Sequence, residues 1–270
     1  MLTPLEIAIQ VFGALGAIMT ICLGIPQLIR LKKTKNTGKI NFAAFWVFYY
    51  GILAWLILGV FTSSENSWYI FLANFTCVSI MSFTMFYLYY YYQEKTKKQM
   101  LRAIIGIAFN QIISFTFLSL FFVTVYQKIK FGAFYPKNSI IPTLPANVQL
   151  IIGLICPSFT TLAFLPGLII SIVKKQLSGL SPWMALTYMF NNTWWIFYFA
   201  LNIVNAQRPD ANEATKESMR GFIGGLVWQL IAISVYTFQF AYTYYVDQKQ
   251  KKLLKSVETL LNKDSTLDKK

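Results

Sequence analysis

Two tryptophans are the side chains in this sequence best suited to hold a small polar molecule. Trp55 and Trp195 each offer a broad apolar ring face and one N–H donor, a combination that stacks on the C–H face of a sugar ring while the donor takes a hydroxyl. Tryptophan is also common at membrane surfaces for reasons unrelated to binding. We predict that the two rings form the walls of a binding site, with interfacial anchoring as the alternative.

Uncharged amides accompany these rings inside long apolar segments. Five such amides are Asn74, Asn191, Asn192, Gln229 and Gln239. An amide at such a depth is costly unless it is paired or faces a wet cavity, and it can both donate to and accept from the hydroxyls of a neutral polyol. Asn191 lies one helical turn before Trp195, so these two should share a helix face. We predict that Asn74, Asn191, Asn192 and Gln229 bind the same solute; hydrogen bonding between helices is the alternative.

Two prolines interrupt apolar segments. Pro26 and Pro166 each remove a backbone donor and allow the helix to bend there. A static kink is the alternative, because proline is tolerated in membrane helices. Their equivalent places in a repeat, described below, favour a hinge.

Groups that would perform acid–base, metal or redox chemistry are missing from the apolar segments. The sequence contains no histidine, and its ten acidic residues all lie outside these segments or at their ends. Proton coupling is therefore not expected, nor is an enzyme, a metal site or a cofactor. No nucleotide-binding loop is present. Cys22, Cys77 and Cys156 read as structural thiols.

The composition requires lipid to cover the chain. Hydrophobic residues make up 56% of the 270 positions and charged residues only 13%, more than one soluble core can hide. Apolar runs long enough to cross a bilayer predict an all-α membrane protein with seven transmembrane helices. They lie at about 5–29, 42–62, 68–92, 103–126, 148–173, 183–204 and 222–246. The first run carries Glu6, has no basic residue before it and leads straight into a second span, so it is read as a helix rather than a signal peptide.

The distribution of Lys and Arg predicts the orientation. Eighteen of the 24 fall between the first and second runs, the third and fourth, the fifth and sixth, or in the tail. Cationic loops stay in the cytosol during insertion, so we expect the N-terminus outside and the C-terminus inside. The same rule accounts for the net charge of +14 without nucleic acid.

An internal repeat organises the helices. A shift of 140 residues places Thr20 on Thr160, Pro26 on Pro166 and Trp55 on Trp195, and a shift of 155 places Asn74 on Gln229. We therefore expect two parallel three-helix repeats joined by a linker helix, a 3+1+3 architecture with a solute path between the halves. The segments are a first repeat (1–98), a linker helix and loop (99–146), a second repeat (147–248) and a basic cytosolic tail (249–270).

These motifs resemble a known family. Pro26-Gln27, the basic stretch through Thr37 and then Trp55 resemble the PQ-loop family and its SWEET and SemiSWEET sugar transporters. The second copy, with Pro166-Gly167, Leu180-Ser181-Pro182 and Trp194 to Tyr198, is similar to the second SWEET repeat. The resemblance implies that Gln27 and Pro182 join Pro26 and Pro166 as hinge or gate residues, and that Asn74 faces a sugar.

The sequence departs from the SWEET pattern at three positions. Phe42 stands where the family has a proline, Gly167 stands where the first repeat has glutamine, and Gln229 stands where an asparagine of the seventh helix faces the sugar. The resemblance therefore indicates the fold more strongly than it indicates the solute.

We expect a facilitative uniporter for a small neutral solute, most consistent with a sugar, in the cell membrane. An amino-acid carrier of the PQ-loop family and a non-transporting receptor or accessory protein are the alternatives. The expected partners are the solute and the lipid bilayer, with assembly into homo-oligomers left open. In the tail, apolar residues at helical spacing between lysines fit either an anionic membrane surface or a solvated helix extension.

Overall fold

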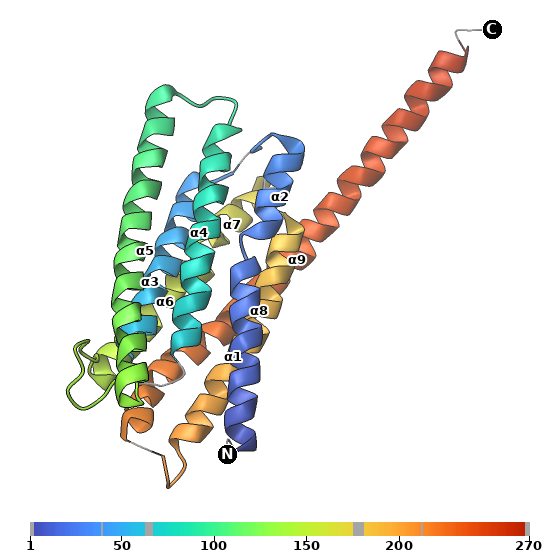
Figure 1. Ribbon diagram of the computed structural model, residues 1–270. Helices are drawn as coiled ribbons and strands as arrows, with labels where there is room; N and C mark the ends of the chain where they lie inside the picture. The colour runs from blue at the N-terminus through green and yellow to red at the C-terminus, as the bar shows by residue number, and fades with distance from the viewer. Residues whose placement is uncertain (1–2, 39, 63–66, 175–180, 212, 268–270) are drawn as a thin grey trace.

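The computed structural model describes residues 3–38, 40–62, 67–174, 181–211 and 213–267, and these form an all-helical bundle (Figure 1). The helices are α1 (Pro4–Cys22), α2 (Ile25–Thr34), α3 (Phe42–Phe61), α4 (Trp68–Tyr90), α5 (Lys97–Phe131), α6 (Ala146–Leu162), α7 (Leu165–Lys174), α8 (Pro182–Ala206) and α9 (Glu213–Leu267). Lys39, Lys175, Leu180, Lys269 and Lys270, used in the sequence analysis, lie outside the described residues.

Six helical segments of the described chain are long and apolar enough to cross a membrane. They are Pro4–Thr34, Phe42–Phe61, Trp68–Tyr90, Lys97–Phe131, Ala146–Ile170 and Thr215–Lys252. The seventh expected span, at 183–204, forms the helix α8, but the mean hydropathy of its most apolar stretch is lower than that of the other six. Its middle carries Asn191 and Asn192, which lower its hydropathy although its 25 residues are enough to span.

Two of the expected spans are each divided into two helices. The first ends at Cys22 and restarts at Ile25, and the fifth ends at Leu162 and restarts at Leu165. Pro26 and Pro166 are each the second residue of the new helix, where a missing N–H costs nothing. Leu23 and Gly24 keep right-handed helical torsion angles, so the first span is interrupted locally at its proline, as the sequence analysis expected. A hinge at Pro26 or Pro166 stays a prediction. A third proline, Pro157, lies inside α6.

The helices pack in two sets with the same pattern of contacts. In one set α4 packs on both α1 and α3, and in the other α9 packs on both α6 and α8. Between the sets, α1 packs on α8 and α3 packs on α6. The long helix α5 packs on α3 and α4, at one edge of the bundle in Figure 1.

Capping side chains fix several helix ends. A capping box of Thr3 and Glu6 starts α1, a second of Thr96 and Gln99 starts α5, and Asn41 caps α3. Gly132, with φ +76°, ends α5. The two caps of α5, Thr96 and Gly132, lie outside the apolar run at 103–126. Helix α5 is therefore longer at both ends than hydropathy alone predicts.

Helix α9 extends well beyond the expected span of 222–246. Its backbone is helical for 55 residues, and in Figure 1 its C-terminal part projects away from the bundle. The tail therefore continues the last helix. The apolar side chains of the tail, for which a membrane surface and a solvated helix extension were both left open, are at 253, 254, 257, 260 and 261 and lie outside the described side chains.

We predict that Gly59→Ala destabilises the protein, because α3 and α4 touch at this glycine. A Cβ there would lie 2.6 Å from the backbone Cα of Phe71, so the helices must separate, at a cost of about 1–3 kcal/mol. Gly167→Ala is the matched control, since nothing lies within 4 Å of its Cβ position. Thermal unfolding in detergent should show a lower midpoint for the first variant alone; equal midpoints would contradict the close packing.

Candidate functional site

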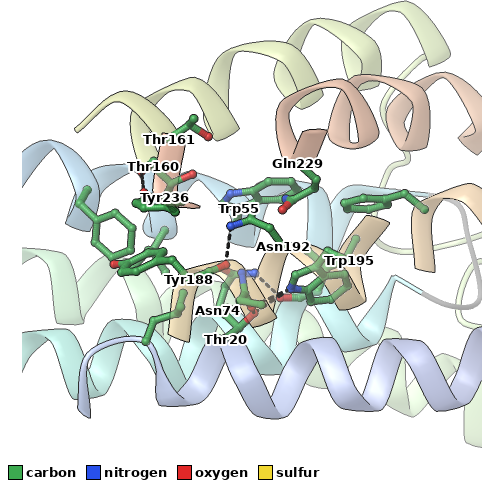
Figure 2. A pocket seen from close by; sticks show the side chains of 16 residues that line it. Thr20, Trp55, Asn74, Thr160, Thr161, Tyr188, Asn192, Trp195, Gln229 and Tyr236 are labelled. Atoms are coloured by element: carbon green, nitrogen blue, oxygen red, sulfur yellow. Dashed lines mark hydrogen bonds between the residues drawn. The ribbon is translucent and has the colours of Figure 1, made fainter. Parts of the chain in front are cut away.

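A cavity lies in the middle of the bundle, between the two sets of helices (Figure 2). It is lined by Thr20, Leu23, Phe48, Ile52, Trp55, Ile70, Asn74, Thr160, Thr161, Tyr188, Asn191, Asn192, Trp195, Phe199, Gln229 and Tyr236. All six residues assigned to solute binding from the sequence line it, although binding itself stays a prediction. Among the described lining residues none is charged.

Residues at equivalent places in the two proposed repeats line this cavity together. Thr20 and Thr160, separated by the shift of 140, both line it, as do Trp55 and Trp195. Asn74 and Gln229, separated by the shift of 155, do so too. The cavity is thus bordered by matched residues from α1 and α6, from α3 and α8, and from α4 and α9.

Trp195 is anchored to the opposite set of helices. Its indole nitrogen donates to the Thr20 hydroxyl at 2.8 Å and to the side-chain oxygen of Asn191 at 3.2 Å. The Thr20 hydroxyl donates in turn to that Asn191 oxygen at 2.6 Å. The expectation that Asn191 and Trp195 share a face is confirmed. The indole N–H, expected to take a solute hydroxyl, is instead used within the protein.

Trp55 is held differently, by stacking alone. Its ring lies parallel to Phe199, with the centroids 6.3 Å apart and the planes at 12°, and Phe199 also stacks on Trp195 at 5.6 Å. No hydrogen bond to the Trp55 indole nitrogen occurs within the described part of the chain. This N–H is therefore the tryptophan donor that a solute can use.

Two of the asparagines are oriented by their own helices. The Asn74 amide donates to the carbonyl of Ile70 at 2.8 Å, and the Asn192 amide donates to the carbonyl of Tyr188 at 2.6 Å. Each bond uses one N–H and fixes the side chain, so the amide oxygen remains to accept a hydrogen bond. Bonds within one helix do not join helices, which argues against the interhelical alternative for these two residues.

Two buried oxygen atoms at the cavity lack a partner within the described part of the chain. The side-chain oxygen of Gln229 and the hydroxyl of Tyr188 are both buried without a hydrogen bond. A buried polar atom left unpaired costs about 1–3 kcal/mol. Water or the hydroxyls of a bound molecule would remove that cost.

Aromatic rings pack together beside the cavity toward both ends of the bundle. Toward the end where α1 begins, Trp55, Phe199 and Phe222 pack together. Toward the other end, Tyr188 stacks on Tyr236 at 4.4 Å and meets the edge of Phe48 at 5.2 Å. We call this second end, where α2 ends among Arg30, Lys32 and Lys33, the basic end.

The predicted gate residues lie at the basic end. Gln27 is fully buried, and its side-chain oxygen accepts from the backbone N–H of Ser181 at 3.1 Å. Ser181 precedes Pro182, the first residue of α8, so this bond links α2 to the start of α8. Phe42, which replaces the expected proline, likewise begins α3. Opening this end would require the bond from Ser181 to Gln27 to break or to move with both helices.

The sequence analysis missed other lining residues. Thr20 and Thr160 matched in the repeat, and that match was the available signal. For Tyr188 and Tyr236 there was no such signal. Aromatic residues occur throughout these helices, and nothing in the sequence distinguishes those that face the cavity. Within the described residues, no three His, Cys, Asp or Glu side chains are grouped so as to hold a metal ion.

Comparison with known families gives one match. Residues 8–68 match the family model described as the PQ loop repeat, a range that covers most of α1 and all of α2 and α3, with Pro26, Gln27 and Trp55. No curated protein matches the chain. The PQ loop repeat and the six apolar helices together make this a multi-pass membrane protein.

Proposed function

We propose that this protein is a facilitative transporter for a small neutral polar solute, with a sugar as the best candidate. The observation that carries the proposal is the composition of the central cavity. Aromatic faces, amides and hydroxyls line it, and no charged group does so among the described residues. Such a surface can stack on a sugar ring and pair its hydroxyls without a counter-charge.

The arrangement of the helices supports alternating access between two halves. α1–α4 would form one repeat and α6–α9 the other, with α5 as the linker in a 3+1+3 order. The matching contact patterns and the matched lining residues support this division. The helix breaks at 23–24 and 163–164 fall at equivalent positions, where each half can bend. Pro26 and Pro166 would then border the two hinges.

We further propose that the basic end faces the cytosol of the cell. Its cationic side chains would remain inside during insertion, which leaves the start of α1 outside. Gln27 and Pro182 would then form part of the cytosolic gate. The proposal includes no enzyme activity, cofactor, metal or nucleic acid.

The amino-acid carrier is the nearer alternative in function. An amino acid carries an ammonium and a carboxylate, which need charged or strongly polar partners when they leave water. The uncharged lining disfavours such a solute. The receptor alternative needs binding on one side only, whereas lining residues contributed by both halves favour a path with two sides.

Uptake into liposomes tests the proposal. Liposomes that hold the purified protein should equilibrate at least one labelled sugar from a panel of mono- and disaccharides faster than protein-free liposomes. A panel of labelled amino acids gives the comparison. Uptake of amino acids but of no sugar would make the protein an amino-acid carrier. Binding of a solute without its uptake would favour a receptor.

We predict that a proton gradient does not drive accumulation. Coupling needs a group whose protonation differs between the inward and outward states, and the acidic residues nearest the membrane, Glu6 and Asp247, lie toward the ends of α1 and of the apolar part of α9. With an imposed pH gradient, the final solute concentration should be equal inside and outside. Accumulation of several-fold, released by a protonophore, would contradict this, and Glu6→Gln and Asp247→Asn would then identify the coupled group.

A further inference from the structure

A second cavity lies at the basic end, away from the central site. It is formed where α3, the end of α4 and the start of α5 meet. It is lined by Phe42, Trp46, Tyr50, Tyr89, Tyr92, Gln99, Arg102, Ala103 and Gly106. We call it the Trp46 groove. Sequence analysis assigned no role to these residues beyond the charge of Arg102 and the start of a span at Phe42.

The walls of the Trp46 groove are held by their own contacts. The Trp46 indole nitrogen donates to the Tyr89 hydroxyl at 2.9 Å. Phe42 packs on Tyr89 with the centroids 4.5 Å apart, and Trp46 stacks on Tyr50 at 5.8 Å. Gly106 allows the Trp46 ring to reach α5, since a Cβ there would lie 2.7 Å from the ring. The groove is therefore a fixed surface rather than a gap between loose side chains.

The groove changes from polar to apolar along α5. Gln99 and Arg102 lie in its first two turns, and Ala103 and Gly106 follow. Ala103 follows Gln99 by four residues, and Gly106 follows Arg102 by four. The polar part and the apolar part are therefore about one helical turn, or about 5.4 Å, apart. Beyond them α5 exposes large apolar side chains, including Phe109 and Ile112, as expected of a surface in contact with acyl chains.

The charge of the groove favours an anionic molecule. Arg102 is exposed and has no hydrogen bond or ion pair within the described part of the chain. The segment that leads to it carries Lys95, Lys97 and Lys98 against a single acidic residue, Glu94, which accepts a hydrogen bond from the Tyr92 hydroxyl at 3.1 Å. Arginine binds phosphate through a planar fork of donors.

We propose that the Trp46 groove binds one anionic phospholipid, with the phosphate on Arg102 and the first part of an acyl chain along Gly106 and Tyr50. The occupant is a lipid rather than a soluble phosphate because aromatic rings and small residues continue the site into the apolar part of the bundle. A basic pocket between helices at a membrane surface is suited to such a headgroup. The proposal does not depend on the transport function.

Native mass spectrometry of the full chain in mild detergent tests the proposal, with phosphatidylglycerol and phosphatidylcholine of the same acyl chains as probes. We expect one phosphatidylglycerol to be retained at concentrations at which phosphatidylcholine is not. Arg102→Gln should weaken this binding about tenfold or more. Lys98→Gln is the matched control, because it removes the same charge from the same part of α5 without lining the groove, and it should leave binding within about twofold.

A second variant tests the apolar part separately. Ala103→Leu keeps Arg102 but fills the groove, and it should also weaken phosphatidylglycerol binding about tenfold while the thermal midpoint shows that the chain remains folded. Equal losses for Arg102→Gln and Lys98→Gln would overturn the proposal in favour of diffuse attraction. Full competition by millimolar inorganic phosphate would also overturn it, because the site would then recognise a free anion.

Discussion

Replacing Trp195 by alanine should abolish most solute uptake while the protein remains folded. The change removes a ring that lines the cavity and stacks on Phe199, and it removes the donor to Thr20 and Asn191 across the two sets of helices. Aromatic stacking contributes about 0.5–1.5 kcal/mol and each hydrogen bond a similar amount. Since 1.4 kcal/mol is a factor of ten, initial uptake in liposomes should fall at least about tenfold.

The neighbouring Trp194→Ala gives a matched control. Trp194 does not line the cavity and stacks instead on Phe12, with the ring centroids 6.0 Å apart. Its loss should change uptake less than about threefold. Trp55→Ala should behave like Trp195→Ala, through loss of a stacking face. Normal uptake in both cavity variants, with normal solute affinity, would remove the tryptophans from the proposed site.

Gln229→Leu should separate a solute-binding amide from a structural one. The Gln229 side-chain oxygen is buried at the cavity without a partner in the described residues, so leucine removes no protein contact of that oxygen and should leave the thermal midpoint unchanged or higher. A solute hydroxyl would lose its partner, at about 1–3 kcal/mol. The ratio kcat/KM for uptake should therefore fall about tenfold to a hundredfold.

Gln239→Leu is the control for this experiment. Gln239 is on the same helix, is also buried and also has an unpartnered side-chain oxygen within the described residues, but it does not line the cavity. Its substitution should leave kcat/KM nearly unchanged. Equal losses in the two variants would mean that burying leucine in α9 disturbs the bundle. A lower midpoint with normal uptake for Gln229→Leu would mark that residue as structural.

Apolar runs located the helices but not their ends or interruptions. The spans at 42–62 and 68–92 agree with α3 and α4 because hydrophobic residues fill those helices from end to end. The start of α5 depends on the polar capping residues Thr96 and Gln99, which hydropathy does not weigh. Breaks of two residues at 23–24 and 163–164 leave the apolar run intact, so only the prolines indicated them.

The central cavity could be predicted because its polar groups are rare at membrane depth. An amide in an apolar helix must have a reason to be there, and comparison of the two halves paired Asn74 with Gln229 and Trp55 with Trp195. Hydrogen bonding between particular atoms could not be predicted in this way. The bonds from the Trp195 indole to Thr20 and Asn191 depend on the separation of α1 from α8, which Gly16 sets by approaching the Trp195 ring.

Because α9 is one uninterrupted helix, a tilt of its part inside the bundle would move its projecting C-terminal part as well. About twenty of its residues follow the expected span, and at 1.5 Å per residue they form an arm of about 30 Å. A tilt of about 10° within the bundle would move the tip by about 5 Å. The projecting part of α9 would thus turn a small change at the cavity into a larger displacement of its tip. The distance between a spin label near Leu267 and one on α2 would measure that displacement in the membrane.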